Sequence, residues 1–497
     1  MGDGVAKHVT MGTRFMSITF FAVIATLCHA QTLEEVLGYG LPVVVVNTLN
    51  GEEPTAERID HPSGCVGVGI TNATKVPGHV RIYYPGDTEN PVFDSGEYVE
   101  GESGMTFKLR GNTSALDAKK PFKIKLQKKA DLLMRGDKRF NDKDWALLRP
   151  RGGKTFPCPV VTMAGNKVAE ILKVTDWVPA SMYVNLIVND NFRGFYLLTE
   201  TIKRNEKCRI DIDKETGFIS ELDPYWWNED LYVESKFLLK NASAYKFTFK
   251  YPDSDDITEE QLGAFKEFLD LFDSSMGLGR YPQLIDVESC VRWLLAHQLL
   301  GTLDSAGSNI FFIRRDNQSK LEMGPLWDFD SVFRVSGTWT SIMSVHYFRY
   351  MLRTSPNKLL AREMIRIWNS EKEQIMAEVT NFCDSLSGSE LAQAFDRSIT
   401  ANYKRWYVNL DDMTTTVSKL RDWFPTRAEE IDSLLNTLNT VDGDFTYDPN
   451  LNFVGIKDNW GQDNQTSVQK VIQGRHLYII QDGKTYSIDG RRINGRY

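Results

Sequence analysis

The stretch LDSAGSNIFF at residues 303–312, followed by GPLWDFD at residues 324–330, has the most informative pattern of this 497-residue chain. Asn309 begins a strand-like apolar run, Asp316 and its neighbour predict a turn, and the chain can then return towards Asp328. We therefore expect a β-hairpin that brings Asn309 and Asp328 to adjacent strand ends, close enough to share a metal. The alternative interpretation is an ordinary hairpin with capping acids.

The polar residues of these two stretches suit phosphoryl transfer. That chemistry needs a carboxylate that orients or deprotonates the acceptor, and oxygen ligands that hold magnesium on the phosphates. Asp304 and Asn309 have the Asp-x-x-x-x-Asn spacing that protein kinases use for these roles, and Asp328-Phe329-Asp330 stands where kinases have Asp-Phe-Gly. The spacing alone occurs often by chance, but its combination with the Trp-Asp-Phe-Asp element is specific.

Strand signals dominate the chain as far as about residue 200. Strand-like runs lie at 41–46, 80–84, 105–110, 181–188 and 195–199. Residues 121–126 alternate apolar and basic side chains, so Phe122 and Ile124 should face a core while Lys123 and Lys125 face the opposite way. A single helix is predicted in this half, at 167–173.

Helix signals dominate the second half. Thr258 with Gln261 three residues later is a capping-box pattern, and Asp286 begins another helix. Further helices are expected at 357–384, 388–408 and 412–438. A β-rich half followed by a helix-rich half predicts an α+β, two-lobed fold rather than an alternating α/β sheet.

The N-terminus predicts export. Basic residues up to Arg14 precede an uncharged run at 15–28, and small residues then precede Gln31, as in a cleaved signal peptide over residues 1–30. The competing transmembrane anchor would need about 20 apolar residues. We therefore expect a mature protein without a transmembrane anchor, in the periplasm, on the cell surface or outside the cell.

The C-terminus predicts a polar linker at 441–465 and a small β tail at 466–497, after a main domain at 31–440. An Asp-Gly pair at 482–483 separates two strand-like runs and indicates a hairpin. Residues 486–493 resemble the short β tail on many exported proteins of the Bacteroidetes. A sorting role and a packing role both remain open for this tail.

Composition excludes one class of partner. The net charge of −8 argues against a general nucleic-acid binder, which needs a basic face, although a local basic cleft is compatible with it. After cleavage of the leader, five dispersed cysteines would remain, with neither a disulfide framework nor metal-ligand spacing. Export is therefore inferred from the leader alone.

These residues resemble the CotH (spore coat protein H) kinase family over about residues 40–435. The matching landmarks lie at 109–114, 119–125, 144–148, 194–200, 304–309 and 327–330. The resemblance implies an atypical protein-kinase-like fold, ATP with Mg²⁺ or Mn²⁺, and transfer to a Ser, Thr or Tyr hydroxyl of a protein substrate. It makes Asp304 the catalytic aspartate and Asn309 and Asp328 metal ligands, with Asp330 either a further metal ligand or an orienting carboxylate.

The resemblance also implies a nucleotide-binding set. Its members are Lys123, Lys125, Arg110, Asn112, Ser114 and Glu200. Lys123 is preferred to Lys125 for the phosphates, and the turn at 111–114 is either a phosphate-binding loop or a plain β-turn. Glu200 is either the edge of a nucleotide pocket or a structural acid.

One segment departs from the family pattern. Residues 149–165 are rich in Pro and Gly where the family leads into a helix, so we expect only a short helix beginning near Asn166. Glu170 on that helix is either the partner of the phosphate-binding lysine or a solvated side chain. Two other functions compete with a kinase: a noncatalytic adhesion module, and carbohydrate hydrolysis by a carboxylate pair, which lacks a supporting motif.

Overall fold

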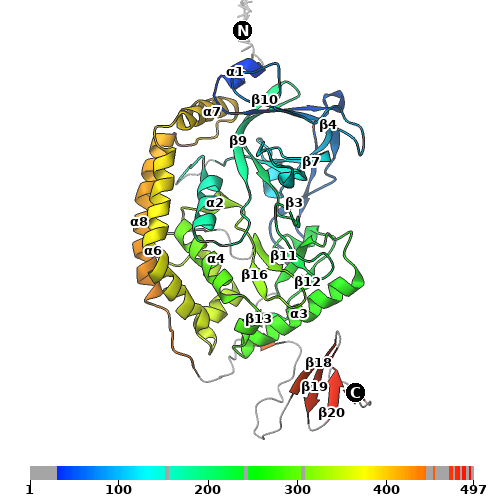
Figure 1. Cartoon of the computed structure of the whole chain (residues 1–497), viewed down its shortest axis with the longest axis vertical. Helices are drawn as coiled ribbons and strands as arrows, with labels where there is room; N and C mark the ends of the chain where they lie inside the picture. The colour runs from blue at the N-terminus through cyan, green and yellow to red at the C-terminus, as the bar shows by residue number, and fades with distance from the viewer. Residues whose placement is uncertain are drawn as a thin grey trace, which may run out of the picture.

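The computed structural model describes residues 31–151, 156–239, 244–303 and 308–443, and the strand backbones at 451–453, 469–473, 476–481, 484–487 and 492–493. The predicted signal peptide and the predicted catalytic Asp304 therefore lie outside the described residues. The fold is mixed α+β, with a β-rich N-terminal part and a helical C-terminal part (Figure 1). This confirms the order of elements predicted from the sequence.

Seven strands of the N-terminal part close into a barrel. They are β1 (Val43–Thr48), β4 (Val76–Tyr83), β6 (Met105–Leu109), β7 (Phe122–Ala130), β8 (Asp142–Leu148), β9 (Ser181–Val188) and β10 (Asn191–Glu200). Their order is β1-β9-β10-β8-β7-β6-β4, and pairing of β1 with β4 completes the ring. The short strand β5 (Phe93–Asp94) pairs with β4. Phe122 and Ile124 are buried and Lys125 is exposed, as the alternation along β7 predicts.

The connections of the barrel follow local sequence signals. Asn189 and Asp190 both have positive φ angles, of 47° and 60°, as a tight two-residue hairpin turn between β9 and β10 requires. Helix α2 (Val161–Ile171) begins earlier than the position near Asn166 that the sequence predicts. The prediction was wrong because prolines before the first turn of a helix do not interrupt its hydrogen bonds.

The C-terminal part contains a five-stranded sheet. Its strands, in order, are β12 (Val233–Glu234), β14 (Lys246–Tyr251), β11 (Phe218–Leu222), β15 (Ile310–Arg314) and β16 (Leu321–Met323). The predicted β15–β16 hairpin is confirmed. The sequence prediction missed β11, β12 and β14. All five residues of β11 are buried, so this strand shows no apolar-polar alternation.

The helices of the C-terminal part agree with the predicted ones. They are α3 (Glu259–Gly277), α4 (Val287–Leu300), α5 (His346–Arg349), α6 (Leu359–Leu386), α7 (Glu390–Trp406) and α8 (Met413–Leu435), and α1 (Leu33–Leu37) precedes the barrel. Thr258 forms the predicted capping box of α3, and Asp286 caps α4. Helices α4, α6 and α8 pack against one another (Figure 1). Within the described ranges, no helix has both the length and the apolar character that crossing a bilayer requires.

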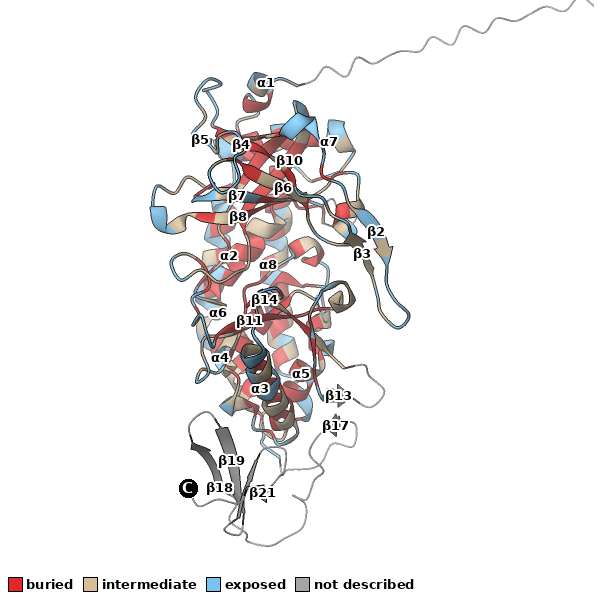
Figure 2. Ribbon diagram, turned by 90° about the vertical axis from the view of Figure 1, so that its right-hand side faces the viewer, coloured by how far each residue is buried: buried red, intermediate tan, exposed pale blue. Residues whose placement is uncertain are grey.

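Several contacts join the barrel to the C-terminal part, and two of them lie on different sides of the molecule. Asn402 of α7 accepts a hydrogen bond from the buried Lys119 Nζ through Oδ1, at 2.6 Å. On another side, the hairpin of β2 (Glu57–Asp60) and β3 (Val68–Thr71) extends from the barrel (Figure 2). There the indole Nε1 of Trp227 donates to the carbonyl of Val66 at 3.1 Å. Both contacts hold the two parts together across the cleft described below.

The C-terminal tail forms a small antiparallel sheet. Its strands are β18 (Gln469–Gln473), β19 (His476–Gln481), β20 (Lys484–Ser487) and β21 (Arg492–Ile493). Gln481 pairs with Lys484, so the β19–β20 hairpin predicted from the sequence is confirmed. Upstream of the tail, β17 (Leu451–Phe453) pairs with β13 (Phe237–Leu239).

Candidate active site

A cleft of about 1740 Å³ lies between the barrel and the five-stranded sheet. Most of the site residues predicted from the sequence line it. They are Arg110, Asn112, Ser114, Lys123, Lys125, Asn309, Asp328 and Asp330. Glu200 does not line the cleft, and Asp304 lies outside the described residues. The structure therefore gathers residues from both halves of the chain around one cavity.

The metal-ligand candidates Asn309, Asp328 and Asp330, here called the acidic end, lie beyond the base of the β15–β16 hairpin. The backbone N–H of Gly324 donates to the carbonyl of Phe311 at 2.7 Å, which continues the hairpin towards the cleft. Asn309 and Asp328 have φ angles of 56° and 59°, in the left-handed region that residues other than Gly rarely occupy. Strained backbone of this kind is concentrated at functional sites.

The two carboxylates of the acidic end interact electrostatically. Burial and the negative charge of Asp328 raise the pKa of Asp330 to about 6. Arg151 opposes this shift, because its Nη1 lies 3.7 Å from Asp330 Oδ2. Asp328 also accepts a long hydrogen bond, of 3.4 Å, from the backbone N–H of Asp330. A cation bound beside both carboxylates would relieve their repulsion.

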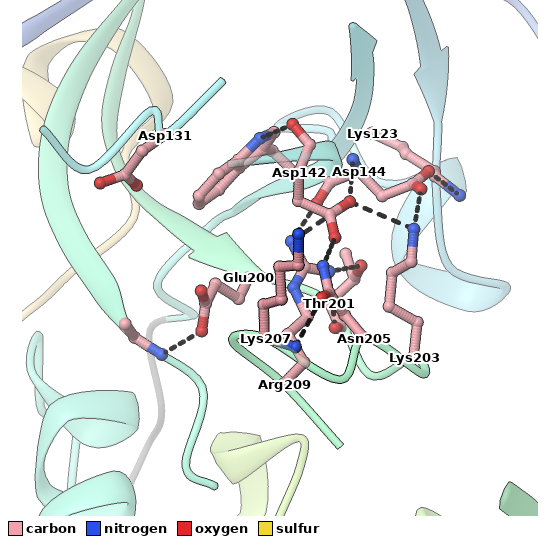
Figure 3. Close-up of polar contacts among 12 residues, drawn as sticks. Lys123, Asp131, Asp142, Asp144, Glu200, Thr201, Lys203, Asn205, Lys207 and Arg209 are labelled. Carbon is pink, nitrogen blue, oxygen red and sulfur yellow. Dashed lines mark hydrogen bonds and ion pairs between the residues drawn. The ribbon is translucent and has the colours of Figure 1, made fainter. Parts of the chain in front are cut away.

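The opposite side of the cleft is a basic wall, which we define as Lys108 and Arg110 from the β6 segment and Lys123 and Lys125 from β7. Lys123 Nζ forms an ion pair with Asp144 Oδ1 of β8, at 3.1 Å (Figure 3). The predicted preference for Lys123 is consistent with this contact, because the ion pair orients its side chain.

Asp144 also binds Lys203. The Nζ atom of Lys203 lies 2.7 Å from Asp144 Oδ2 and 3.1 Å from Asp142 Oδ1 (Figure 3). Burial would raise the pKa of Asp144, but the charges of Lys123 and Lys203 outweigh burial and hold the pKa well below its ordinary value. Asp144 therefore stays ionised and connects β7 with the segment that follows β10.

Arg110 is the member of the basic wall that meets the segment of the acidic end. Its guanidinium carbon is 5.6 Å from the centre of the Trp327 ring. Burial lowers the pKa of Arg110, and the charges of Asp328 and Glu221 oppose that shift. The next residue, Gly111, has a φ of +78°, so the turn after Arg110 needs a glycine.

The turn that contains Asn112 and Ser114 has its backbone groups partly occupied. The carbonyl of Asn112 accepts from the N–H of Ala115 at 3.2 Å, and Ser114 lies in a short 3₁₀ helix, η2 (Thr113–Leu116). A Cβ at Gly111 would approach Ser114 Oγ to 2.3 Å. This crowding brings the Ser114 hydroxyl close to the backbone that follows Arg110.

The structural interpretation fits Glu200. Its buried carboxylate (labelled in Figure 3) forms an ion pair with Arg135 at 2.9 Å. It also accepts hydrogen bonds from Trp177 Nε1 and the Ala180 N–H, each at 3.1 Å. These contacts connect the end of β10 to neighbouring segments of the barrel. The carboxylate has its own partners and is turned away from the cleft lining.

Glu170 is the solvated side chain of the two alternatives. It is exposed on α2 and pairs with Lys167 at 3.1 Å. Lys123 has Asp144 as its carboxylate partner instead. The structure therefore replaces the expected helix glutamate by an aspartate on the neighbouring strand.

Seven basic residues that line the cleft were missed in the sequence: Lys108, Arg149, Arg151, Lys203, Arg204, Lys214 and Lys250. Lys108 had a usable signal, because it stands two residues before Arg110 on a predicted strand and so shares its face. Arg151 lies in the Pro- and Gly-rich segment, where no periodicity indicates direction. Its contact with Asp330 depends on tertiary structure alone.

The acidic end fits a magnesium or manganese ion shared with phosphates. Over the described ranges, no three His, Cys, Asp or Glu side chains converge as a complete metal cluster. Two carboxylates and an amide oxygen nevertheless suit Mg²⁺, which is usually bound through one or two carboxylates with substrate phosphates and water. Asp328 and Asp330, with Asn309, are the residues that would hold it.

Comparisons with known proteins agree with the motifs. The CotH kinase protein family matches residues 107–431, more than half of the chain. No curated protein matches the sequence. Among solved structures, the proinflammatory kinase CtkA of Helicobacter pylori is similar, with 12% identity and a TM-score of 0.16 over 59% of this chain and 85% of that one.

Proposed function

This chain belongs to the CotH kinase protein family, and we propose that it is an exported atypical protein kinase with a two-lobed, protein-kinase-like fold. Family membership implies the use of ATP. The proposed reaction transfers the terminal phosphoryl group of ATP to a Ser, Thr or Tyr hydroxyl of a protein substrate. Export is inferred from the leader pattern at residues 1–30.

The observation that carries this proposal is the pairing of an acidic end with a basic wall in one cleft. Asn309, Asp328 and Asp330 line the same cavity as Arg110 and Lys123. Phosphoryl transfer depends mainly on positioning and on electrostatic stabilisation of the phosphates, which is what these two groups would supply together.

The step requires an acceptor hydroxyl and a base. The hydroxyl oxygen attacks the γ-phosphorus, the bond from that phosphorus to its bridging oxygen breaks, and ADP leaves with the bond electrons. The hydroxyl proton passes to a carboxylate, for which we propose Asp304. Lys123 and Arg110 would balance the phosphate charges, and a divalent cation held by Asp328 would neutralise charge on the phosphate oxygens.

The test is phosphate transfer by the purified chain. We expect label from γ-labelled ATP to reach the chain itself, or Ser-, Thr- and Tyr-containing peptides, in the presence of Mg²⁺ or Mn²⁺. Asp328→Asn should lower kcat by about 10³-fold, because a neutral amide stabilises the charged phosphates far less than a carboxylate-bound cation does. Asn also tolerates the left-handed backbone at this position, so the fold should be retained.

A matched control lies on the same hairpin. Asp316 caps the β15–β16 turn by accepting from the N–H groups of Gln318 and Ser319, each at 2.8 Å, and does not line the cleft. Asp316→Asn makes the same chemical change and should leave kcat within about twofold. If labelling is equal for wild type, Asp328→Asn and Asp304→Ala, the kinase proposal is wrong and a noncatalytic scaffold is favoured.

A further inference from the structure

The basic wall has a regular spacing that follows from its strands. Lys108 on β6 is paired in register with Lys123 on β7. The residues that flank Lys108 on β6, Phe107 and Leu109, are buried in the barrel. Lys108 therefore lies on the other face of the strand, where it lines the cleft with Lys123. Two lysines therefore stand side by side on one face of the sheet.

This pairing is unfavourable unless an anion balances it. Like charges directly opposite each other on neighbouring strands destabilise a sheet. Lys123 is balanced by Asp144, which also binds Lys203. Among the described residues, Lys108 has no carboxylate within 4.0 Å, although Glu229 attracts it from further away. Burial lowers the pKa of Lys108, and the charges of Lys75 and Lys123 lower it further.

The wall also has a direction. Lys108 and Arg110 are two residues apart, and extended chain advances about 7 Å over that interval. This length is comparable to the distance from the first to the last phosphorus of an extended triphosphate. Arg110 is the member close to Trp327 and attracted by Asp328, so it marks the end where transfer would occur. Through Asp144, the Lys108–Lys123 pair is connected to the segment after β10 instead.

We propose that the phosphate chain of the nucleotide lies along β6, with Arg110 at the terminal phosphoryl group and Lys108, beside Lys123, at the phosphate nearest the nucleoside. The inference rests on the proposed kinase function, and it assigns Lys108 as a nucleotide-binding residue. It also places the nucleoside towards Lys203 and the segment that follows β10.

The orientation can be tested with nucleotides of different length. Dissociation constants for ATP, ADP, AMP and adenosine are measured by calorimetry with Mg²⁺ on the purified wild type, Lys108→Ala and Arg110→Ala. Lys108→Ala should weaken ATP, ADP and AMP alike, by about tenfold or more, and leave adenosine unchanged, because one charge-assisted contact is lost. Arg110→Ala should weaken ATP by a similar factor and leave AMP unchanged.

Two further variants separate binding from folding. Lys129 is exposed on β7 and does not line the cleft, so Lys129→Ala removes the same charge from the same sheet and should change no dissociation constant. Lys108→Arg should retain most of the affinity for AMP, since it keeps the positive charge.

The outcomes distinguish this inference from the proposed function. Equal weakening of adenosine and AMP by Lys108→Ala would show a structural role and overturn the assignment. If Arg110→Ala weakens AMP as much as it weakens ADP and ATP, the orientation of the phosphate chain is the reverse of the one proposed. Both results leave the kinase proposal standing. A wild type that binds none of the nucleotides would overturn both proposals.

Discussion

The basic wall and the acidic end line the same cleft but are built differently. Lys108 and Lys123 stand on regular antiparallel strands whose other face is the barrel core, so the sheet register determines their spacing. Asn309 and Asp328 stand outside regular strands, with positive φ angles. Within this cleft, therefore, these two lysines stand on regular strands, whereas two of the metal-ligand candidates stand on left-handed backbone.

The two regions should therefore respond differently to substitution. Residues in sparsely populated backbone regions cost about 1–3 kcal/mol each and persist only where surrounding structure or function retains them. Strand residues with solvent-facing charges carry no such cost. Substitutions of residues that support the basic wall should lower the stability of the barrel. Substitutions at the acidic end should instead lower activity with little loss of stability.

The largest expected effect comes from loosening the barrel behind the wall. Glu200 ends β10 beside Trp145 of β8, the strand that carries Asp144. Arg135 keeps Asp131 as a partner in Glu200→Gln, but the buried carboxylate's charge-assisted contacts with Arg135, Trp177 and Ala180 are weakened. The free energy of unfolding should therefore fall by about 3 kcal/mol. Urea denaturation measures this loss, and the nucleotide affinity of the folded variant should stay close to wild type.

Glu170→Gln is the matched control for Glu200→Gln. It makes the same substitution at an exposed side chain whose only recorded ion pair in the described ranges is with Lys167, so stability should hardly change. The opposite result, a Glu200→Gln protein of normal stability that binds nucleotide weakly, would place Glu200 in the nucleotide site.

A second prediction concerns the support of the acidic end. His297 is buried near the end of α4, with Nδ1 3.0 Å from Thr302 Oγ1, and the next residue, Leu303, donates its N–H to the carbonyl of Ser331 at 3.0 Å. Burial lowers the pKa of His297 to about 3. Between pH 6.5 and 3 the unfolded chain therefore binds a proton that the folded chain does not.

Stability from this group is complete above the unfolded pKa of about 6.5 and is lost as the pH falls. At pH 5 the loss should be about 2 kcal/mol relative to pH 7. Denaturation at both pH values measures it, and the difference between them should be about 2 kcal/mol smaller in His297→Gln. An unchanged difference in the variant would exclude His297 as the source.

The smallest expected effect separates stability from activity at the acidic end. Asn309→Gly should change the free energy of unfolding by less than about 0.5 kcal/mol, because asparagine already tolerates its φ of 56°, while transfer activity falls. Lys173→Gly is the control: Lys173 has a φ of 51° after α2 and does not line the cleft. Lys173→Gly should gain about 1 kcal/mol of stability with full activity, because lysine tolerates this conformation less well than asparagine does.

A loss of stability in Asn309→Gly would contradict the comparison. It would mean that side-chain contacts of Asn309, rather than function, retain its backbone conformation. Thermal denaturation of both glycine variants beside wild type, together with their transfer rates, gives the result.

Much of the barrel, and the direction of the lysines on its strand β7, could be predicted from local patterns. Alternation along residues 121–126 put Lys123 and Lys125 on the face opposite the core, and the Asn189-Asp190 turn joined β9 to β10. Capping residues marked the starts of α3 and α4. Each of these signals acts over a few residues, which is why a single sequence contains it.

The errors occurred where burial removes the signal. Strand β11 is buried on both faces, and α2 begins inside a segment whose prolines suggested irregular structure. The roles expected for Glu200 and Glu170 depended on which long-range partner each carboxylate meets, and no local pattern indicates such a partner.

By itself, the sequence determined which residues could perform the chemistry and which face of each strand they occupy, because strand and hairpin periodicity are local properties of the backbone. Only the tertiary structure decided which charges meet. Asp144 rather than Glu170 binds Lys123, Arg151 reaches Asp330, and Lys108 joins the wall. These contacts follow from closure of the barrel and from the packing of two distant parts around one cleft, where burial makes the choice of partner energetically decisive.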